Sequence, residues 1–353
     1  MNGFSSLPHT AVAAAAALLL GSLGAGCGSA PEPAPVPPPS FPAIARLEAM
    51  QIPADNPMTV AKVELGKQLY YDERLSGDGK RSCYSCHVEE RGLTDGRPLA
   101  VGAYDRTLTR SSPTMWNIGY HQEWYWDGRA KTLEQQARAA WSGANMGANG
   151  KDGPSMDQVC AALNTLDGYR KAFEAVFGTA CTPDNVPQAL AAFMRTIVST
   201  DSPWIRFRDG DQTAFSASAR RGHQIFDGKA QCSRCHSGAL LTDLQFHNVG
   251  VGMDAKEPDL GRFNVTKQEK DRGAFKTPTL LDVSKSAPYF HNGSVATLEA
   301  AVDQMLAGGR PNPWLDKVNL EPVTLTKEER ADLLQFLREL TVRYTIAPPT
   351  LPK

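Results

Sequence analysis

Two short strings in the sequence combine cysteine and histidine at a fixed spacing. They are "RSCYSCH" and "QCSRCH", with Cys83, Cys86 and His87 in the first and Cys232, Cys235 and His236 in the second. A Cys-x-x-Cys pair alone could bind zinc or work as a redox dithiol, but neither use needs a histidine directly after the second cysteine. When that histidine is present, both sulfurs can add to the vinyl groups of haem while the histidine ligates the iron. The sequence therefore predicts two covalently attached c-type haems.

The composition is that of a soluble globular protein with room for two domains. The chain has 353 residues, of which 41% are hydrophobic and 21% are charged. Its 37 basic and 38 acidic residues leave a formal net charge of −1, and no long basic run is present. We therefore expect no nucleic-acid partner.

The first residues have the features of an export signal. Residues 10–27, "TAVAAAAALLLGSLGAGC", are an apolar run that is short for a membrane span and ends in small residues before Cys27. This end looks like a lipoprotein signal, so we expect residues 1–27 to be a signal peptide with a lipid anchor at Cys27. Plain cleavage and release is the alternative. The proline-rich residues 28–50 would form a stiff linker, and the protein would be periplasmic, tethered to the membrane only through the anchor.

Export also bears on the two cysteines that remain, Cys160 and Cys181. Unpaired thiols are a liability in an oxidising compartment, so we expect a disulfide between them.

Helical periodicity surrounds both Cys-x-x-Cys-His strings. Residues 59–72 carry apolar side chains on one broad face, and residues 216–230 do so after a serine N-cap. Residues 184–200 and 325–340 are further amphipathic segments, and Thr326 begins the second of these with glutamates in the first turn. No alternating pattern is long enough to build a sheet.

These patterns predict a mainly α fold with two cytochrome c-like domains in tandem, related by duplication. The N-terminal domain would span residues 51–208 and the C-terminal domain residues 209–347, each with one covalent c-type haem.

Further strings resemble one known family, the bacterial dihaem cytochrome c peroxidases and their MauG-like relatives, from about residue 55 to 345. The strings are "LGKQLYYDERLSGDGKRSCYSCH", "GLTDGRPLAVG", "WDGRAKTLEQQA", "RGHQIFDGKAQCSRCHSG", "HNVGVG", "DRGAFKTPTL" and "APYFHNGSVATLEAAV". The resemblance implies that the N-terminal haem has an open iron position that meets peroxide. It also implies that the C-terminal haem is closed by two protein ligands and relays electrons.

The resemblance assigns axial ligands to both irons. His87 and His236 would be the proximal ligands. Met305 would be the second ligand of the C-terminal iron, where MauG-like enzymes have tyrosine; a thioether favours reduced iron, which suits a haem that receives electrons. Met253 is the alternative sulfur, and plain helix packing is the alternative role of Met305.

The family's peroxide site implies a glutamine and, about ten residues later, a glutamate. Gln136 fills the first place, but Asn145 stands at the second, and an amide cannot shuttle a proton at neutral pH. Glu134 lies near in sequence but is expected to point away from Gln136 as a solvated helix residue.

Family members that need reductive activation carry a further histidine ligand on the N-terminal iron. Ala103 stands at that place, so the oxidised protein would already be competent, and His121 is the alternative ligand.

The family also places a tryptophan between the haems, and Trp126 matches it, with Trp116 and Trp124 as weaker candidates. Packing at the domain junction is the alternative role of Trp126. His291 is expected to support the C-terminal haem pocket through hydrogen bonding rather than by ligating iron.

A calcium ion between the domains is a further implication of the resemblance. Its ligands would be Ser111, in place of the family's asparagine, and the carbonyls of Lys276 and Pro278. A serine hydroxyl is a poorer calcium ligand than an amide carbonyl.

The leading functional hypothesis is reduction of hydrogen peroxide to water with electrons from a small cytochrome c or cupredoxin. One alternative is a MauG-like oxidase that modifies a residue of a partner protein. Another is a dihaem electron carrier without enzymatic activity. The resemblance also suggests a homodimer.

Overall fold

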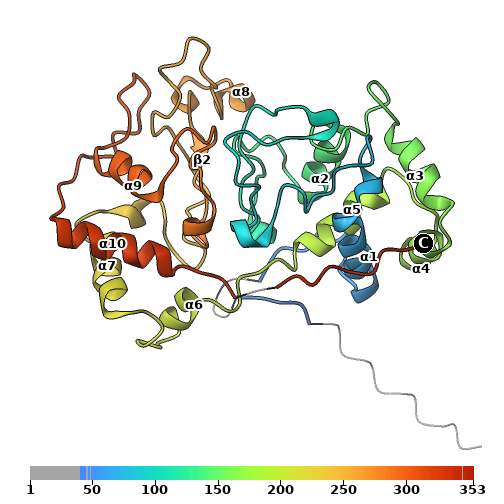
Figure 1. The fold of residues 1–353 in the computed structure, drawn as a ribbon, viewed down its shortest axis with the longest axis horizontal. Coiled ribbons are helices and arrows are strands. Elements are labelled where there is room, and N and C mark those ends of the chain that lie inside the picture. Colours follow the sequence, from blue (N-terminus) through green and yellow to red (C-terminus); the bar gives the residue numbers. More distant parts are fainter. Residues whose placement is uncertain (1–39, 45–46, 48, 344) are drawn as a thin grey trace, which may run out of the picture. The chain divides into compact units, whose positions relative to one another are not determined.

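Short helices joined by long irregular segments make up the part of the chain that the computed structural model describes, residues 40–44, 47, 49–343 and 345–353 (Figure 1). The predicted signal peptide, the anchor at Cys27 and most of the linker lie outside these residues. Among the described residues, no helix combines the length and the apolar character that a membrane crossing requires.

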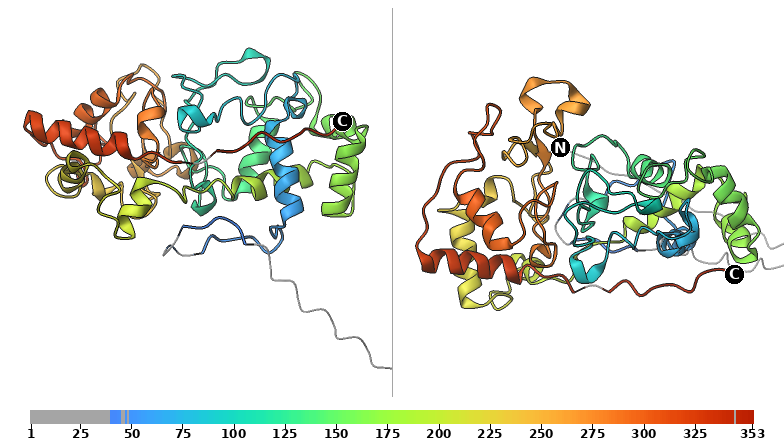
Figure 2. Two further views of the ribbon diagram at one scale, coloured as in Figure 1. Left: turned by 60° about the horizontal axis from the view of Figure 1, so that its bottom comes forward. Right: turned by 45° about the horizontal axis from the view of Figure 1, so that its top comes forward.

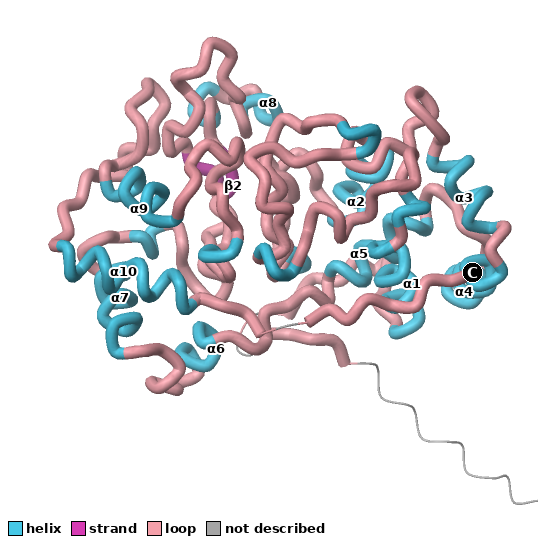
Figure 3. Tube along the Cα trace, viewed as in Figure 1, coloured by secondary structure: helices cyan, strands magenta, loops and turns pink. Residues whose placement is uncertain are grey.

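The predicted mainly α class is confirmed (Figure 3). The α-helices are α1 Val60–Tyr71, α2 Leu133–Ser142, α3 Met156–Asn164, α4 Asp167–Phe177, α5 Asn185–Met194, α6 Pro203–Arg208, α7 Ala217–Asp227, α8 Phe263–Thr266, α9 Leu298–Leu306 and α10 Lys327–Glu339. Two strands of two residues each, β1 Phe246–His247 and β2 Phe275–Lys276, pair antiparallel, with Phe246 opposite Lys276.

The helices expected around the Cys-x-x-Cys-His strings form at the expected places, and side-chain caps fix where they begin. Ser216 accepts a hydrogen bond from the Ala219 amide at the start of α7, and Thr326 forms a capping box with Glu329 at the start of α10.

Two helix pairs form the core on either side of the molecule, α1 with α5 and α7 with α10 (Figure 2). The two pairs repeat one contact. A Cβ added to Gly66 of α1 would lie 1.9 Å from the carbonyl oxygen of Ala189 and 2.9 Å from Cβ of Phe193. A Cβ added to Gly222 of α7 would lie 2.0 Å from the carbonyl oxygen of Asp332 and 2.8 Å from Cβ of Phe336. In both pairs, the missing side chain lets two helix backbones touch.

The recurrence of this contact is what a duplication would leave behind. Residues 39–353 nevertheless form a single compact unit. The division into cytochrome c-like domains at residues 51–208 and 209–347 therefore stays a prediction. The residues up to 208 are called the N-terminal half, and those from 209 the C-terminal half.

A disulfide joins two segments of the N-terminal half. Cys160 of α3 and Cys181, which precedes α5, form the predicted disulfide.

The last residues of the chain lie along the N-terminal half rather than the half that precedes them. The Tyr71 hydroxyl donates to the Ile346 carbonyl over 3.0 Å, and the Ile346 amide donates to Glu89 over 2.6 Å. The Gly168 amide in α4 donates to the Lys353 carbonyl over 3.3 Å.

Candidate active site

Each Cys-x-x-Cys-His string lies at the wall of its own cavity. The N-terminal cavity, of about 490 Å³, contains Cys83, Cys86 and His87 in its lining. The C-terminal cavity, of about 260 Å³, contains Cys232, Cys235 and His236.

Both histidines are oriented by the same contact, between the ring Nδ1 and a leucine carbonyl oxygen. Nδ1 of His87 lies 3.0 Å from the carbonyl oxygen of Leu93, and Nδ1 of His236 lies 3.1 Å from that of Leu241. Leu93 and Leu241 both have a left-handed backbone, with φ of 60° and 51°. A carbonyl on Nδ1 fixes the ring so that Nε2 is the nitrogen left for a metal, which is how ligating histidines are usually oriented.

The ionisation of these groups also fits a haem. Burial lowers the pKa of both His87 and His236, so both rings are neutral, as a metal ligand must be. Burial raises the pKa of Cys83 and Cys232 to about 12 and that of Cys86 to about 11. These thiols are therefore protonated and are not reactive surface thiolates. Two thiols, a neutral imidazole and a cavity at each string match what haem c requires.

Methionines line both cavities, Met115, Met146 and Met194 the N-terminal one and Met305 the C-terminal one. Met305 of α9 is part of the C-terminal cavity lining, as predicted. Met253 lines neither cavity; its sulfur instead packs where a Cβ on Gly273 would come within 2.4 Å. The geometry favours Met305 over Met253, and its role as an iron ligand stays a prediction.

Trp126 lies in the wall of both cavities. Its indole Nε1 donates to the carbonyl oxygen of Ser111 over 3.0 Å, which fixes the ring. Trp124 lines only the N-terminal cavity, and Trp116 lines neither; its indole donates to Asp282 over 3.0 Å. Trp126 is thus the tryptophan whose place suits a link between two cofactors.

The polar residues predicted for peroxide chemistry meet in the N-terminal cavity. Gln136 of α2 and Asn145, just after α2, both line it. Ala103 does not: its amide donates to the Asn145 carbonyl over 3.0 Å, and its methyl group faces Gly147. The expectation that no histidine at position 103 closes the N-terminal iron stays a prediction.

Glu134 does point away from the N-terminal cavity, but it is not a solvated helix residue. Its carboxylate accepts hydrogen bonds from Arg195 and from Asn56, each over 2.7 Å, and Arg195 is 3% exposed. The expectation of a solvated side chain was wrong because its partners lie in α5's C-terminal turn and before α1, far away in sequence.

Two titratable side chains, those of His121 and Lys276, are in contact in the N-terminal cavity, and only the first was expected from the sequence as a candidate side-chain ligand. His121, the alternative ligand, lines this cavity, and its Nδ1 lies 3.1 Å from Nζ of Lys276. Lys276 lines both cavities, and burial lowers its pKa to about 7. Burial, with the neighbouring Lys276, also lowers the pKa of His121 well below its usual value. Nothing in the local sequence indicates this contact, since the two residues are 155 positions apart.

The residues predicted to hold calcium lie close to the tryptophan. Ser111, Lys276 and Pro278 line both cavities. The Ser111 hydroxyl already donates to the carbonyl oxygen of Phe290 over 2.9 Å, and the calcium site stays a prediction.

His291 lies beside the C-terminal cavity, and the hydrogen-bonding support expected of it stays a prediction. It lines the C-terminal cavity and stacks on Phe275 with ring centroids 3.6 Å apart. Burial lowers its pKa to about 4, so the ring is neutral and apolar contact dominates its role.

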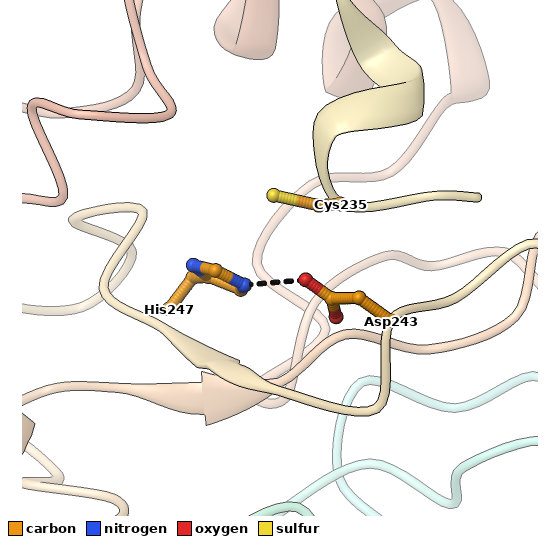
Figure 4. A group of neighbouring side chains, drawn as sticks. All are labelled: Cys235, Asp243 and His247. Atoms are coloured by element: carbon orange, nitrogen blue, oxygen red, sulfur yellow. Dashed lines mark hydrogen bonds and ion pairs between the residues drawn. The ribbon is translucent and has the colours of Figure 1, made fainter.

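Cys235, Asp243 and His247 form a group that sequence reasoning missed (Figure 4). Their ligand atoms are close enough to hold a metal ion, but both ring nitrogens of His247 are already used. Nε2 lies 2.9 Å from Asp243 and Nδ1 lies 2.6 Å from Asp316. The bond to Asp243, then the contacts with Cys235 and Asp316, raise the pKa of His247 to about 11. The ring is an imidazolium that fastens three segments together beside the second string.

Comparison with known proteins agrees with these features. A family model described as di-haem cytochrome c peroxidase matches residues 60–213. Cytochrome-c peroxidase IdrP1 of Denitromonas iodatirespirans is 37% identical over 334 residues, which cover 86% of this chain and 87% of the relative. The methylamine utilization protein MauG of Methylorubrum extorquens is 38% identical over 313 residues, covering 87% and 85%.

A solved structure gives the same result. The crystal structure of a MauG-like protein associated with microbial copper homeostasis has a TM-score of 0.74 and 31% identity, covering 88% of this chain and 95% of that one. With two haem-type strings at two cavities and these relatives, the chain belongs to the di-haem cytochrome c peroxidase family and is an oxidoreductase of the peroxidase type.

Proposed function

We propose that this protein reduces hydrogen peroxide to water with electrons from a small periplasmic cytochrome c or cupredoxin. Each peroxide would take up two electrons and two protons and give two waters. The observation that carries the proposal is that Gln136 and Asn145 line the N-terminal cavity, whereas Met305 of α9 lines the C-terminal one.

Cys83 and Cys86 would hold one haem with His87 as ligand, and Cys232 and Cys235 the other with His236. A bound haem supplies redox-active iron, which accepts an oxidant where an axial position is open and exchanges electrons where two ligands close it.

The N-terminal cavity would bind and orient peroxide. The amide groups of Gln136 and Asn145 can each donate a hydrogen bond to a peroxide oxygen and accept one from its O–H. Neither side chain can carry a proton at neutral pH, so these residues fix the substrate and leave proton delivery to other groups.

The C-terminal cavity would receive electrons. Met305 would close its iron, and the stacked rings of Phe275 and His291 form part of the cavity wall. Trp126, in the wall of both cavities, would shorten the path between them. Each cavity would belong to one cytochrome c-like domain, residues 51–208 and 209–347, with calcium at Ser111, Lys276 and Pro278 between them.

The setting of the activity is part of the proposal. Export and an acyl anchor at Cys27 would hold the enzyme in the periplasm, where small redox proteins diffuse.

Electron paramagnetic resonance of the oxidised protein, with its full haem content, tests the proposal. We expect one high-spin and one low-spin iron, and steady peroxide consumption with a reduced cytochrome c. Met305→Leu should abolish the low-spin signal, whereas the matched Met253→Leu should leave it unchanged. Two low-spin irons, or no bound haem, would refute the proposal.

A second candidate function is oxidation of a residue on a partner protein. It is favoured by MauG-named relatives at 38% and 34% identity and opposed by Met305, since the resemblance places tyrosine there in MauG-like enzymes. It predicts a mass change on a co-purified partner after peroxide is added, without steady turnover of cytochrome c.

A further inference from the structure

The helices α2 and α9 occupy equivalent places in the two halves. Each follows a short antiparallel bridge, Trp124 to Ala130 before α2 and Tyr289 to Val295 before α9. Two residues after each bridge, a threonine caps the helix. The Gln135 amide donates to Thr132 over 3.0 Å, and the Ala300 amide donates to Thr297 over 3.2 Å.

The caps set a common register for the two helices. Counting from the capping threonine, the fourth, fifth, eighth and ninth residues of each helix line the adjacent cavity. In α2 these are Gln136, Ala137, Ala140 and Trp141, and in α9 they are Ala301, Val302, Met305 and Leu306. Residues four apart lie on one face of a helix, so both helices turn the same face to their cavities.

At two of these positions, the two helices carry side chains of different chemical type. The fourth position holds an amide, Gln136, beside the N-terminal cavity and a methyl group, Ala301, beside the C-terminal one. The eighth position holds a methyl group, Ala140, in the first and a thioether, Met305, in the second. A methyl group cannot bind iron and a thioether can.

We propose that Ala140 is the residue that keeps an axial position open at the N-terminal site. The inference rests on the proposed function, in which Met305 closes the C-terminal iron. Position 140 then determines which site admits an oxidant, because it is the place from which the other half of the molecule supplies its second ligand.

Other methionines line the N-terminal cavity, but they stand elsewhere in the repeat. Phe193 and Phe336 are equivalent, because each lies against the glycine of its helix pair. Met194 of α5 follows the first and Leu337 of α10 follows the second, so Met194 corresponds to Leu337, a wall residue of the C-terminal cavity, and not to Met305. The sulfur of Met115 lies 3.5 Å from the Tyr70 hydroxyl. The third, Met146, lies in the turn after α2, where its amide donates to the Ala140 carbonyl over 3.1 Å.

The test is Ala140→Met in the haem-loaded protein. We expect the high-spin signal of the N-terminal iron to be lost, a methionine-to-iron charge-transfer band to be gained, and cyanide binding to the oxidised protein to be abolished. Ala140→Leu is the matched control, because leucine fills similar space without a ligand atom. It should keep the high-spin signal.

A low-spin Ala140→Leu protein would overturn the inference, since bulk rather than a thioether would then account for the change. An Ala140→Met protein that keeps its high-spin iron and binds cyanide would also overturn it.

The reverse variant keeps the inference testable if Ala140→Met does not load haem. Met305→Ala should make the C-terminal site resemble the N-terminal one, with a second high-spin iron and a second cyanide equivalent bound. A C-terminal iron that loses its methionine signature yet binds no cyanide would contradict the equivalence of the two positions. The wild-type spectrum separates the two proposals: two low-spin irons there refute the proposed function, whereas failure of the variants alone refutes only the role of Ala140.

Discussion

At the scale of single residues, the two cavities differ by side chains rather than by how they are built. Both have a histidine with Nδ1 on a leucine carbonyl and half-buried thiols beside it. Gln136 and Asn145 line the N-terminal cavity, and Met305 lines the C-terminal one at the helix position where the N-terminal cavity has Ala140. Single substitutions at these positions should therefore change the chemistry of each site.

Asn145→Glu should accelerate the reaction with peroxide. A carboxylate at this position of the cavity could move a proton between peroxide oxygens, and general acid–base catalysis supplies about 10²-fold or more. Stopped-flow mixing of the protein with peroxide measures the rate. Asn145→Gln is the control, because it keeps an amide and should gain nothing; an equal rate in both variants would contradict this role for position 145.

Spacing in the sequence was enough to predict the haem strings, and the family resemblance pointed to Gln136, Asn145 and Trp126. Spacing could not predict contacts between distant residues. Glu134 pairs with Arg195, which is 61 residues away in sequence, and His121 contacts Lys276, which is 155 residues away. The sequence contains one sign that Ala140 and Met305 are equivalent, because a Thr-Leu-Glu triplet stands at 132–134 and again at 297–299. The triplet can be interpreted only once both helices are known to line cavities.

At the scale of helices, close backbone contact defines each core pair. The glycine that permits it lies in mid-helix, where glycine weakens a helix by about 1 kcal/mol relative to alanine. Its occurrence at both Gly66 and Gly222 shows that packing outweighs helix propensity at these places.

Gly66→Ala should destabilise the protein in spite of alanine's better helix propensity. The new methyl group would lie 1.9 Å from the Ala189 carbonyl oxygen, so α1 and α5 must move apart, at a cost of about 1–3 kcal/mol or more. Denaturant unfolding measures the change. Val60→Ala, at an α1 residue that is 65% exposed, should stay within about 0.5 kcal/mol, and equal effects of the two variants would speak against the contact.

Periodicity predicted α1, α5, α7 and α10, and cap residues indicated where α7 and α10 begin. The strands β1 and β2 have two residues each, so no alternation could reveal them. They exist because the chain brings Phe246 opposite Lys276 from thirty positions away.

At the scale of the whole molecule, one buried carboxylate links distant parts of the chain. Asp282, 1% exposed, accepts from the Trp116 indole over 3.0 Å, from the Val342 amide over 3.0 Å and from Lys285 over 2.8 Å. It therefore joins the N-terminal half, the C-terminal half and the final segment.

Asp282→Ala should lower the free energy of unfolding by about 3–5 kcal/mol, because removing one partner of a buried charged network leaves the others unsatisfied. Asp303→Ala breaks the exposed pair with Arg330 and should cost at most about 1 kcal/mol. Thermal or denaturant unfolding of the haem-loaded proteins compares them. Similar losses would show that Asp282 does not link these segments energetically.

The placement of the final segment has a consequence for biosynthesis. Ile346 and Lys353 bond to Tyr71, Glu89 and Gly168, so the half of the protein that is synthesised first is completed by residues that follow the C-terminal half. That half gains these contacts only after the whole C-terminal half has been synthesised.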